Sequence, residues 1–148
     1  MKRQAYTMIA MIVLVGSMAV AAKAQTSGRA QLIANIPFQF SIGNKTLPAG
    51  EYVVRAVSAD SSNVVLKIQS QDGKASMMLQ MRTVEGKAQE TAKLNFNRYG
   101  NHYYFAQAWI DGDNTGLEAP KSRTERATER EFAALKMATE SVTVAARR

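Results

Sequence analysis

Residues 31–42 have the sequence QLIANIPFQFSI, and this stretch decides the fold class. Every second side chain in it is apolar, and that apolar set is Leu32, Ala34, Ile36, Phe38, Phe40 and Ile42. An alternation with period two is typical of a β-strand that buries one face. Pro37 belongs to the opposite set and cannot donate a ladder hydrogen bond, so it indicates a sheet edge or a bulge.

Further runs of the chain alternate in the same way and are separated by short turns: residues 52–57, 64–69, 77–82, 92–97 and 103–110. Asp72-Gly73 is a strong hairpin signal, because both residues tolerate positive φ. We therefore predict a mainly all-β fold over residues 31–111. The expected architecture is an antiparallel six-strand meander that forms a β-sandwich or a partly open β-barrel.

The chain changes character after residue 111. Residues 112–121 contain the turn-forming Asp, Gly and Asn and are expected to form a loop. Ser122 and Glu125 have the spacing of a capping box at a helix start. We predict one amphipathic helix over residues 122–140, packed on the β domain, and a basic tail over residues 141–148. The apolar stripe of this helix would consist of Phe132, Leu135 and Ala138.

The first 24 residues have the features of a cleavable export signal. Lys2 and Arg3 precede a short apolar run over residues 8–15, and Ala22 and Ala24 stand two apart. This order is the pattern that signal peptidase recognises. We predict cleavage between Ala24 and Gln25, a flexible lead over residues 25–30, and a bacterial protein that is secreted or periplasmic.

Composition limits the classes of partner. The chain has 148 residues and no cysteine, which removes disulfides and thiolate chemistry. Without Lys2, Arg3 and Lys23, sixteen basic residues remain against twelve acidic ones, and the excess is dispersed. A dispersed charge of this size does not predict a nucleic-acid binder. We expect no stable membrane insertion after cleavage, and the partner, if any, to be an envelope protein or polymer.

No residue pattern predicts catalysis. His102 is the single histidine, and no nucleophile motif such as G-x-S-x-G accompanies it. We therefore expect a protein that is not an enzyme and needs no cofactor. A hydrolase remains as a less favoured alternative, and it would need His102 within hydrogen-bond reach of an acidic residue in a cleft.

The aromatic residues of the last predicted hairpin suggest a binding surface. Tyr99, Tyr104 and Trp109 are the candidates for contact with a ligand or partner, and the face that carries Tyr104 is too apolar to lie bare in water. Either the C-terminal helix covers this face, or a ligand or a partner does. The leading interpretation is a binding or structural module. The alternative is a lipocalin-like carrier of a small apolar ligand, which needs an apolar cavity of several hundred cubic ångströms.

The loop after the last predicted strand is a weak candidate for calcium. Asp111, Asp113 and Thr115 stand at the first, third and fifth places, and Gly116 at the sixth, as in an EF-hand. However, Ser122 occupies the twelfth place, where the motif requires a bidentate Glu. A plain turn is the preferred interpretation, so we assign no metal site.

Several segments resemble a family of small exported bacterial β-rich proteins of unknown function. They are IPFQF at residues 36–40, GNKTLPAGEY at residues 43–52, RYG at residues 98–100, Trp109, and PKS at residues 120–122 before the charged helix. These segments are turns and core residues, and none is a catalytic signature. The resemblance implies the limits of the mature domain and no mechanism.

The export signal generates one direct prediction. Mass spectrometry of the exported protein should show a chain that begins at Gln25, because Ala22 and Ala24 supply the cleavage site. Recovery of an exported chain with Met1 intact would contradict the assignment of the leader.

Overall fold

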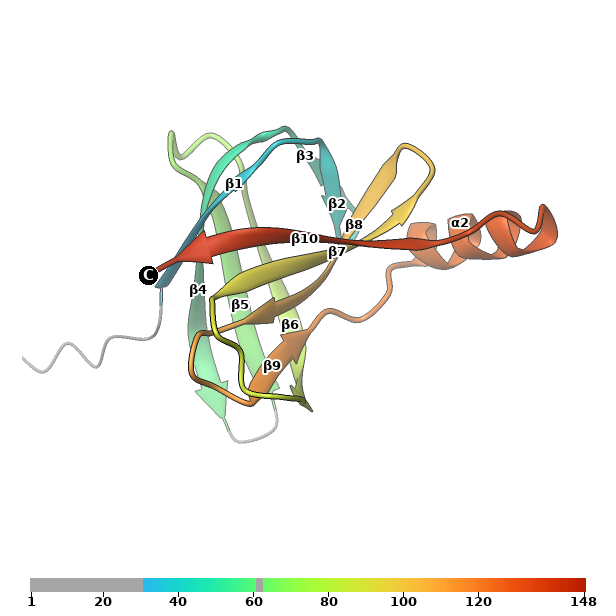
Figure 1. The fold of residues 1–148 in the computed structure, drawn as a ribbon. Coiled ribbons are helices and arrows are strands. Elements are labelled where there is room, and N and C mark those ends of the chain that lie inside the picture. Colours follow the sequence, from blue (N-terminus) through green and yellow to red (C-terminus); the bar gives the residue numbers. More distant parts are fainter. Residues whose placement is uncertain (1–30, 61–62) are drawn as a thin grey trace, which may run out of the picture.

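The computed structural model describes residues 31–60 and 63–148. The predicted cleavage site at Ala22, Ala24 and Gln25, and the lead over residues 25–30, lie outside these residues. The described part contains ten strands and one helix (Figure 1). In chain order they are β1 Gln31–Ile36, β2 Phe40–Ile42, β3 Lys45–Leu47, β4 Gly50–Asp60, β5 Asn63–Ser70, β6 Ser76–Glu85, β7 Lys93–Tyr99, β8 His102–Trp109, β9 Thr115–Glu118, α2 Arg123–Ala134 and β10 Glu140–Arg147.

Eight of these strands form a closed antiparallel barrel. The hydrogen-bonded order runs β8-β7-β10-β1-β4-β5-β6-β9, and β9 pairs back with β8 to complete the ring. The remaining strands, β2 and β3, form a hairpin that joins β8 through the parallel pair Ser41 and Tyr104. The predicted all-β fold with one helix is therefore confirmed. Of the two expected architectures the barrel is the correct one, but it is closed and has eight strands, whereas a partly open meander of six strands was expected.

The alternating apolar side chains fill the barrel. Phe40, Tyr52 and Phe96 are buried at its centre, with ring centroids 5.2 Å apart for Phe40 and Tyr52 and 5.4 Å apart for Phe40 and Phe96. The buried Tyr52 hydroxyl donates to the Pro48 carbonyl at 2.7 Å, so its polar atom is satisfied. An apolar cavity between β1, β4, β5, β8 and β9 measures only about 60 Å³. The side chains themselves occupy the interior.

Trp109 packs against two glycines on neighbouring segments. A Cβ atom at Gly116 would lie 2.7 Å from the indole ring, and a Cβ atom at Gly86 would lie 2.6 Å from it. No larger residue fits at either position without a shift, because real Cβ atoms do not approach other atoms so closely. The small residues let β9 lie close against β8, where Gly116 pairs with Trp109.

Three strands occupy regions that the sequence did not predict as strands, and the first is β3, between two predicted strands. Residues 115–118 form β9 inside the expected loop, and residues 140–147 form β10 where a basic tail was expected. Both expectations are wrong. In β10 the half-buried Val142 and Val144 pack against the core, so this segment follows the strand period although it ends in arginines. Strand β9 has four residues, too few for a period to show.

The helix is shorter than predicted. It begins after the N-cap Ser122, whose Oγ accepts from the Glu125 amide at 3.0 Å, and it ends at Ala134 rather than at residue 140. Lys136 has φ 55°, and the Met137 amide donates back to the Phe132 carbonyl at 3.0 Å. This is the left-handed turn that commonly ends a helix. The chain then runs extended into β10.

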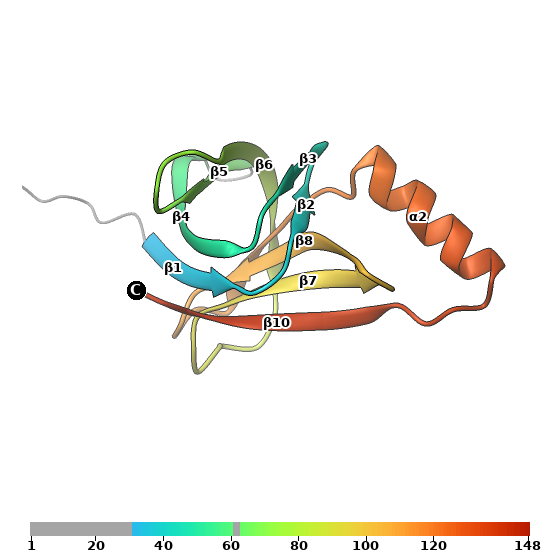
Figure 2. The ribbon, with the colours of Figure 1, turned by 90° about the horizontal axis from the view of Figure 1, so that it is seen from above.

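Helix α2 starts beside the barrel wall and extends away from it beyond the β7–β8 turn (Figure 2). The Phe132 ring lies edge-on to Tyr99 at 5.8 Å, and the Thr128 hydroxyl is 3.0 Å from the Tyr104 hydroxyl. The helix therefore covers Tyr104 itself, whereas Ala108 and Ile110, which the predicted alternation places on the same face, pack in the core. The predicted apolar stripe is wrong in part, because Leu135 and Ala138 are exposed. In the described residues, no helix is both long and apolar enough to cross a membrane.

Candidate functional site

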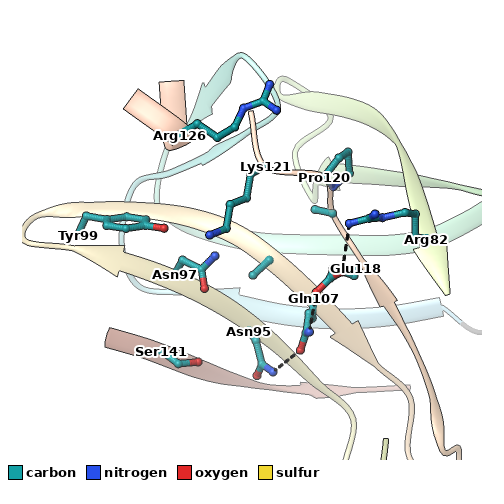
Figure 3. A pocket seen from close by; sticks show the side chains of 12 residues that line it. Arg82, Asn95, Asn97, Tyr99, Gln107, Glu118, Pro120, Lys121, Arg126 and Ser141 are labelled. Carbon is teal, nitrogen blue, oxygen red and sulfur yellow. Dashed lines mark hydrogen bonds and ion pairs between the residues drawn. The ribbon is translucent and has the colours of Figure 1, made fainter. Parts of the chain in front are cut away.

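A polar groove lies on the outer wall of the barrel beside the start of α2 (Figure 3). We call it the outer groove; its volume is about 750 Å³, and strands β6, β7, β8, β9 and β10 and residues 119–121 contribute to its lining. Successive side chains of a strand point to opposite faces. In β7, Leu94 and Phe96 therefore fill the interior, while Asn95 and Asn97 project into the outer groove.

Side-chain contacts cross five adjacent strands along the floor of this groove. The Thr143 hydroxyl on β10 donates to Asn95 Oδ1 at 3.1 Å, and Asn95 Nδ2 donates to Gln107 Oε1 on β8 at 3.3 Å. Gln107 Nε2 donates to Glu118 Oε1 on β9 at 3.2 Å, and Arg82 Nη2 on β6 donates to Glu118 Oε2 at 3.4 Å. We call this chain the outer ladder. It follows the strand order β10-β7-β8-β9-β6.

The outer ladder fixes the orientation of the amide groups in the groove. Gln107 Oε1 also accepts from the Trp109 indole nitrogen at 3.0 Å, so the amide is held from two sides. A net contribution of about 0.5–1.5 kcal/mol is typical of one such hydrogen bond. The ladder therefore adds modest stability, and its larger consequence is a polar floor with a fixed arrangement of donors and acceptors.

A buried carboxylate joins α2 to this floor. Glu125 is 3% exposed, and its Oε1 accepts from Asn97 Nδ2 at 2.8 Å. Burial raises the pKa of the Glu125 carboxyl, while the Asn97 hydrogen bond and the Lys121 charge act in the opposite direction. The predicted capping box is confirmed for the Ser122 hydroxyl, which caps the Glu125 amide. The Glu125 carboxylate binds Asn97 on the barrel instead.

Lys121 projects into the groove between β7 and α2 (Figure 3). Its ammonium group donates to Glu129 Oε1, and this hydrogen bond is the main reason that the pKa of Lys121 is raised. Burial, followed by the charge of Glu125, raises the pKa of the neighbouring Tyr99 hydroxyl. Lys121 is therefore a fixed cation at neutral pH beside a neutral phenol.

The three aromatic candidates are buried. Tyr99 is 1% exposed, and Tyr104 and Trp109 are each 7% exposed. Tyr99 lines the outer groove beside Asn97, while Tyr104 lies under α2 and Trp109 lies against its two glycines. Tyr99 and Tyr104 contact each other edge-on at 5.7 Å. Their rings offer little surface on which a ligand could stack.

The acidic groups of the calcium candidate loop have protein partners. Asp113 Oδ1 accepts from the Thr115 amide at 2.8 Å, as in a common Asp turn. Asp111 Oδ1 accepts no hydrogen bond, but the Arg148 Nε lies 3.8 Å from it as an ion pair. Within residues 31–60 and 63–148, no group of three His, Cys, Asp or Glu side chains is arranged to hold a metal.

His102 lies at the turn end of β8. It is exposed, and its side chain makes no hydrogen bond or ion pair with another residue of the described part of the chain. It does not line the outer groove. The acid and cleft that a hydrolase would require beside His102 are not assembled among these residues.

Sequence reasoning missed the residues of the outer groove. No motif or spacing in the sequence predicts a site at Asn95, Gln107, Glu118, Lys121 or Arg126. The period-two pattern correctly places Asn95 outside the barrel. Their convergence depends on β9 and β10, which were not predicted.

Comparison with known proteins identifies no relative. No family model matches the chain, no curated protein is significantly similar to it, and no solved structure matches it significantly. The class of the protein therefore stands on its fold: a small closed β-barrel with one packed helix.

Glu125 generates a prediction on pH. Because its pKa is higher in the folded than in the unfolded chain, the folded state retains the proton between the two values. Stability then falls as pH rises through this interval. The Glu125→Gln variant has no carboxyl at this position and should lack this loss. As pH rises above the ordinary pKa of glutamate, the free energy of unfolding of the native chain should therefore fall more than that of the variant.

The measurement is urea unfolding of both proteins at a series of pH values. The groups that face Glu125, namely Tyr99, Lys121 and Glu129, are present in both chains. Glu131→Gln, an exposed change on the same helix, is the matched control and should follow the native curve. Parallel curves for the native chain and Glu125→Gln would contradict the assigned role of burial.

Proposed function

We propose that this protein is an exported, non-enzymatic binding module of the bacterial cell envelope, and that its ligand occupies the outer groove. The observation that carries the proposal is the contrast between the two faces of the barrel wall. The outer groove measures about 750 Å³ and has a preorganised polar floor, whereas an interior cavity lined by described residues of five strands measures about 60 Å³. Ligand sites usually measure about 300–1,000 Å³.

The small interior argues against the carrier alternative. A lipocalin-like protein encloses its ligand within the barrel, and the space here would hold only a few waters. Phe40, Phe96 and Phe105 occupy the volume that a carrier would leave empty. A barrel that is filled in this way presents its outer surface to partners.

Two further features support the proposal. The leader with Ala22 and Ala24 supports export. Two ion pairs at the outer groove, Arg82 with Glu118 and Lys121 with Glu129, support binding rather than catalysis, because these four groups are already paired. A general base needs an open approach to its substrate. In the groove, these ion pairs hold charged groups in fixed positions where a ligand can contact them.

The test is a nuclear magnetic resonance titration of the exported chain with two sets of probes. The first set comprises soluble oligosaccharide and disaccharide-peptide fragments of the cell envelope, and the second is dodecanoate, a simple apolar ligand. We expect the first set to shift the side-chain amides of Asn95, Asn97 and Gln107. Ala106→Phe, which fills the groove floor, should abolish these shifts, while the exposed Ala145→Phe on β10 should not.

Thermal unfolding of both variants verifies that they fold. Shifts caused by dodecanoate at the interior residues Leu32, Val54 and Leu66 would contradict the proposal and favour the carrier. Failure of every envelope fragment to shift the groove amides would also contradict it.

A further inference from the structure

A second hollow lies on the other side of the start of α2. Its volume is about 870 Å³, and it lies between the β2–β3 turn at Gly43 and Asn44, Leu79 on β6, and the first residues of the helix. It shares Pro120, Lys121 and Arg126 with the outer groove. The two hollows therefore meet along the segment from residue 120 to residue 126.

The charged side chains that line these two hollows are mostly cations. Lys121, Arg123 and Arg126 line the second hollow without any acidic residue, and Arg82 adds a fourth cation in the outer groove. The single carboxylate among the lining residues is Glu118, and Arg82 already pairs with it. Lys121 pairs with Glu129 in the same way, so the excess positive charge of the paired hollows comes from Arg123 and Arg126 at the helix start.

Two of these cations are uncompensated. The exposed side chains of Arg123 and Arg126 make no hydrogen bond or ion pair with any residue in the described ranges. Both stand in the first turns of α2, where the helix dipole favours negative rather than positive side chains. Their position therefore lowers the stability of the helix slightly. An anion bound between the arginines and the helix start would be attracted by both, so its net electrostatic effect would be stabilising.

The neutral groups beside these cations restrict the ligand class. Asn95, Asn97 and Gln107 present side-chain amides, which bind hydroxyl groups well. The neighbouring rings of Tyr99 and Trp109 are buried, so the paired hollows offer no stacking platform for nucleobases. A guanidinium group binds a carboxylate through two parallel hydrogen bonds. The ligand that fits these groups carries hydroxyls and at least two carboxylates, and an acidic polysaccharide has both.

We propose that the ligand of this site is an acidic polysaccharide, whose carboxylates pair with Arg123 and Arg126 and whose hydroxyls contact the amides of the outer groove. This inference rests on the proposed function and names the ligand class of the same site. The chain of sugars passes from one hollow to the other across Lys121 and Arg126, which both hollows share.

The test compares two probes of equal length by isothermal titration calorimetry on the exported chain. The first is a hexamer of galacturonic acid, and the second is the same hexamer with every carboxylate methyl-esterified. We expect the acid form to bind at least about tenfold more tightly than the neutral ester, and its affinity to fall as salt rises. The Arg123→Ala/Arg126→Ala variant should lose about tenfold in affinity for the acid form.

Arg130→Ala is the matched control, because it removes the same charge from the same helix outside both hollows, and it should keep the native affinity. Equal binding of acid and ester, with shifts of the Asn95 and Gln107 amides, would overturn the inference and leave the proposed function standing. Tighter binding of a glycerol-phosphate oligomer or of oligothymidylate would overturn it in favour of a phosphate polymer. Absence of binding by the uronate hexamer would overturn it as well, while the envelope fragments test the groove separately.

Discussion

Strand β9 pairs with β6 through Thr115–Glu118 on one edge and with β8 through Gly116–Glu118 on the other, and this short strand closes the barrel. Strand β10 completes the opposite side between β7 and β1. Without these pairings, the hairpin β7–β8 and the meander β4–β5–β6 would have free edges. Closure removes those edges and encloses the aromatic core around Phe96.

Closure also creates the candidate site. The outer ladder needs Thr143 from β10, Asn95 from β7, Gln107 from β8, Glu118 from β9 and Arg82 from β6, and only the closed order makes these strands neighbours. The segment after β9 then places Lys121 over the groove and leads into α2, where Glu125 reaches Asn97. The function that we propose is thus a consequence of where the last third of the chain pairs. Because the interior is filled, we place the proposed binding site on the outer wall.

The sequence predicted the elements with a clear period and missed those without one. The alternation from Leu32 to Ile42 and the capping pattern at Ser122 were sufficient for the all-β class and for the helix start. The length of α2 could not be predicted, because Leu135 continues the helical pattern, whereas the left-handed Lys136 ends it. The close approach of Trp109 to Gly116 likewise depends on tertiary packing. The site was missed because its residues are ordinary polar side chains that only β9 and β10 bring together.

Amide hydrogen exchange tests the closure of the barrel most directly. The account predicts that the amides of Gly116 and Leu117 in β9, and of Val142 and Val144 in β10, exchange about as slowly as those of Val54 and Ile68 in the central strands, because all belong to one cooperative sheet. Fast exchange in β9 and β10, with protection confined to β4, β5 and β6, would show an open sheet. That result would contradict the closed barrel and, with it, the outer ladder.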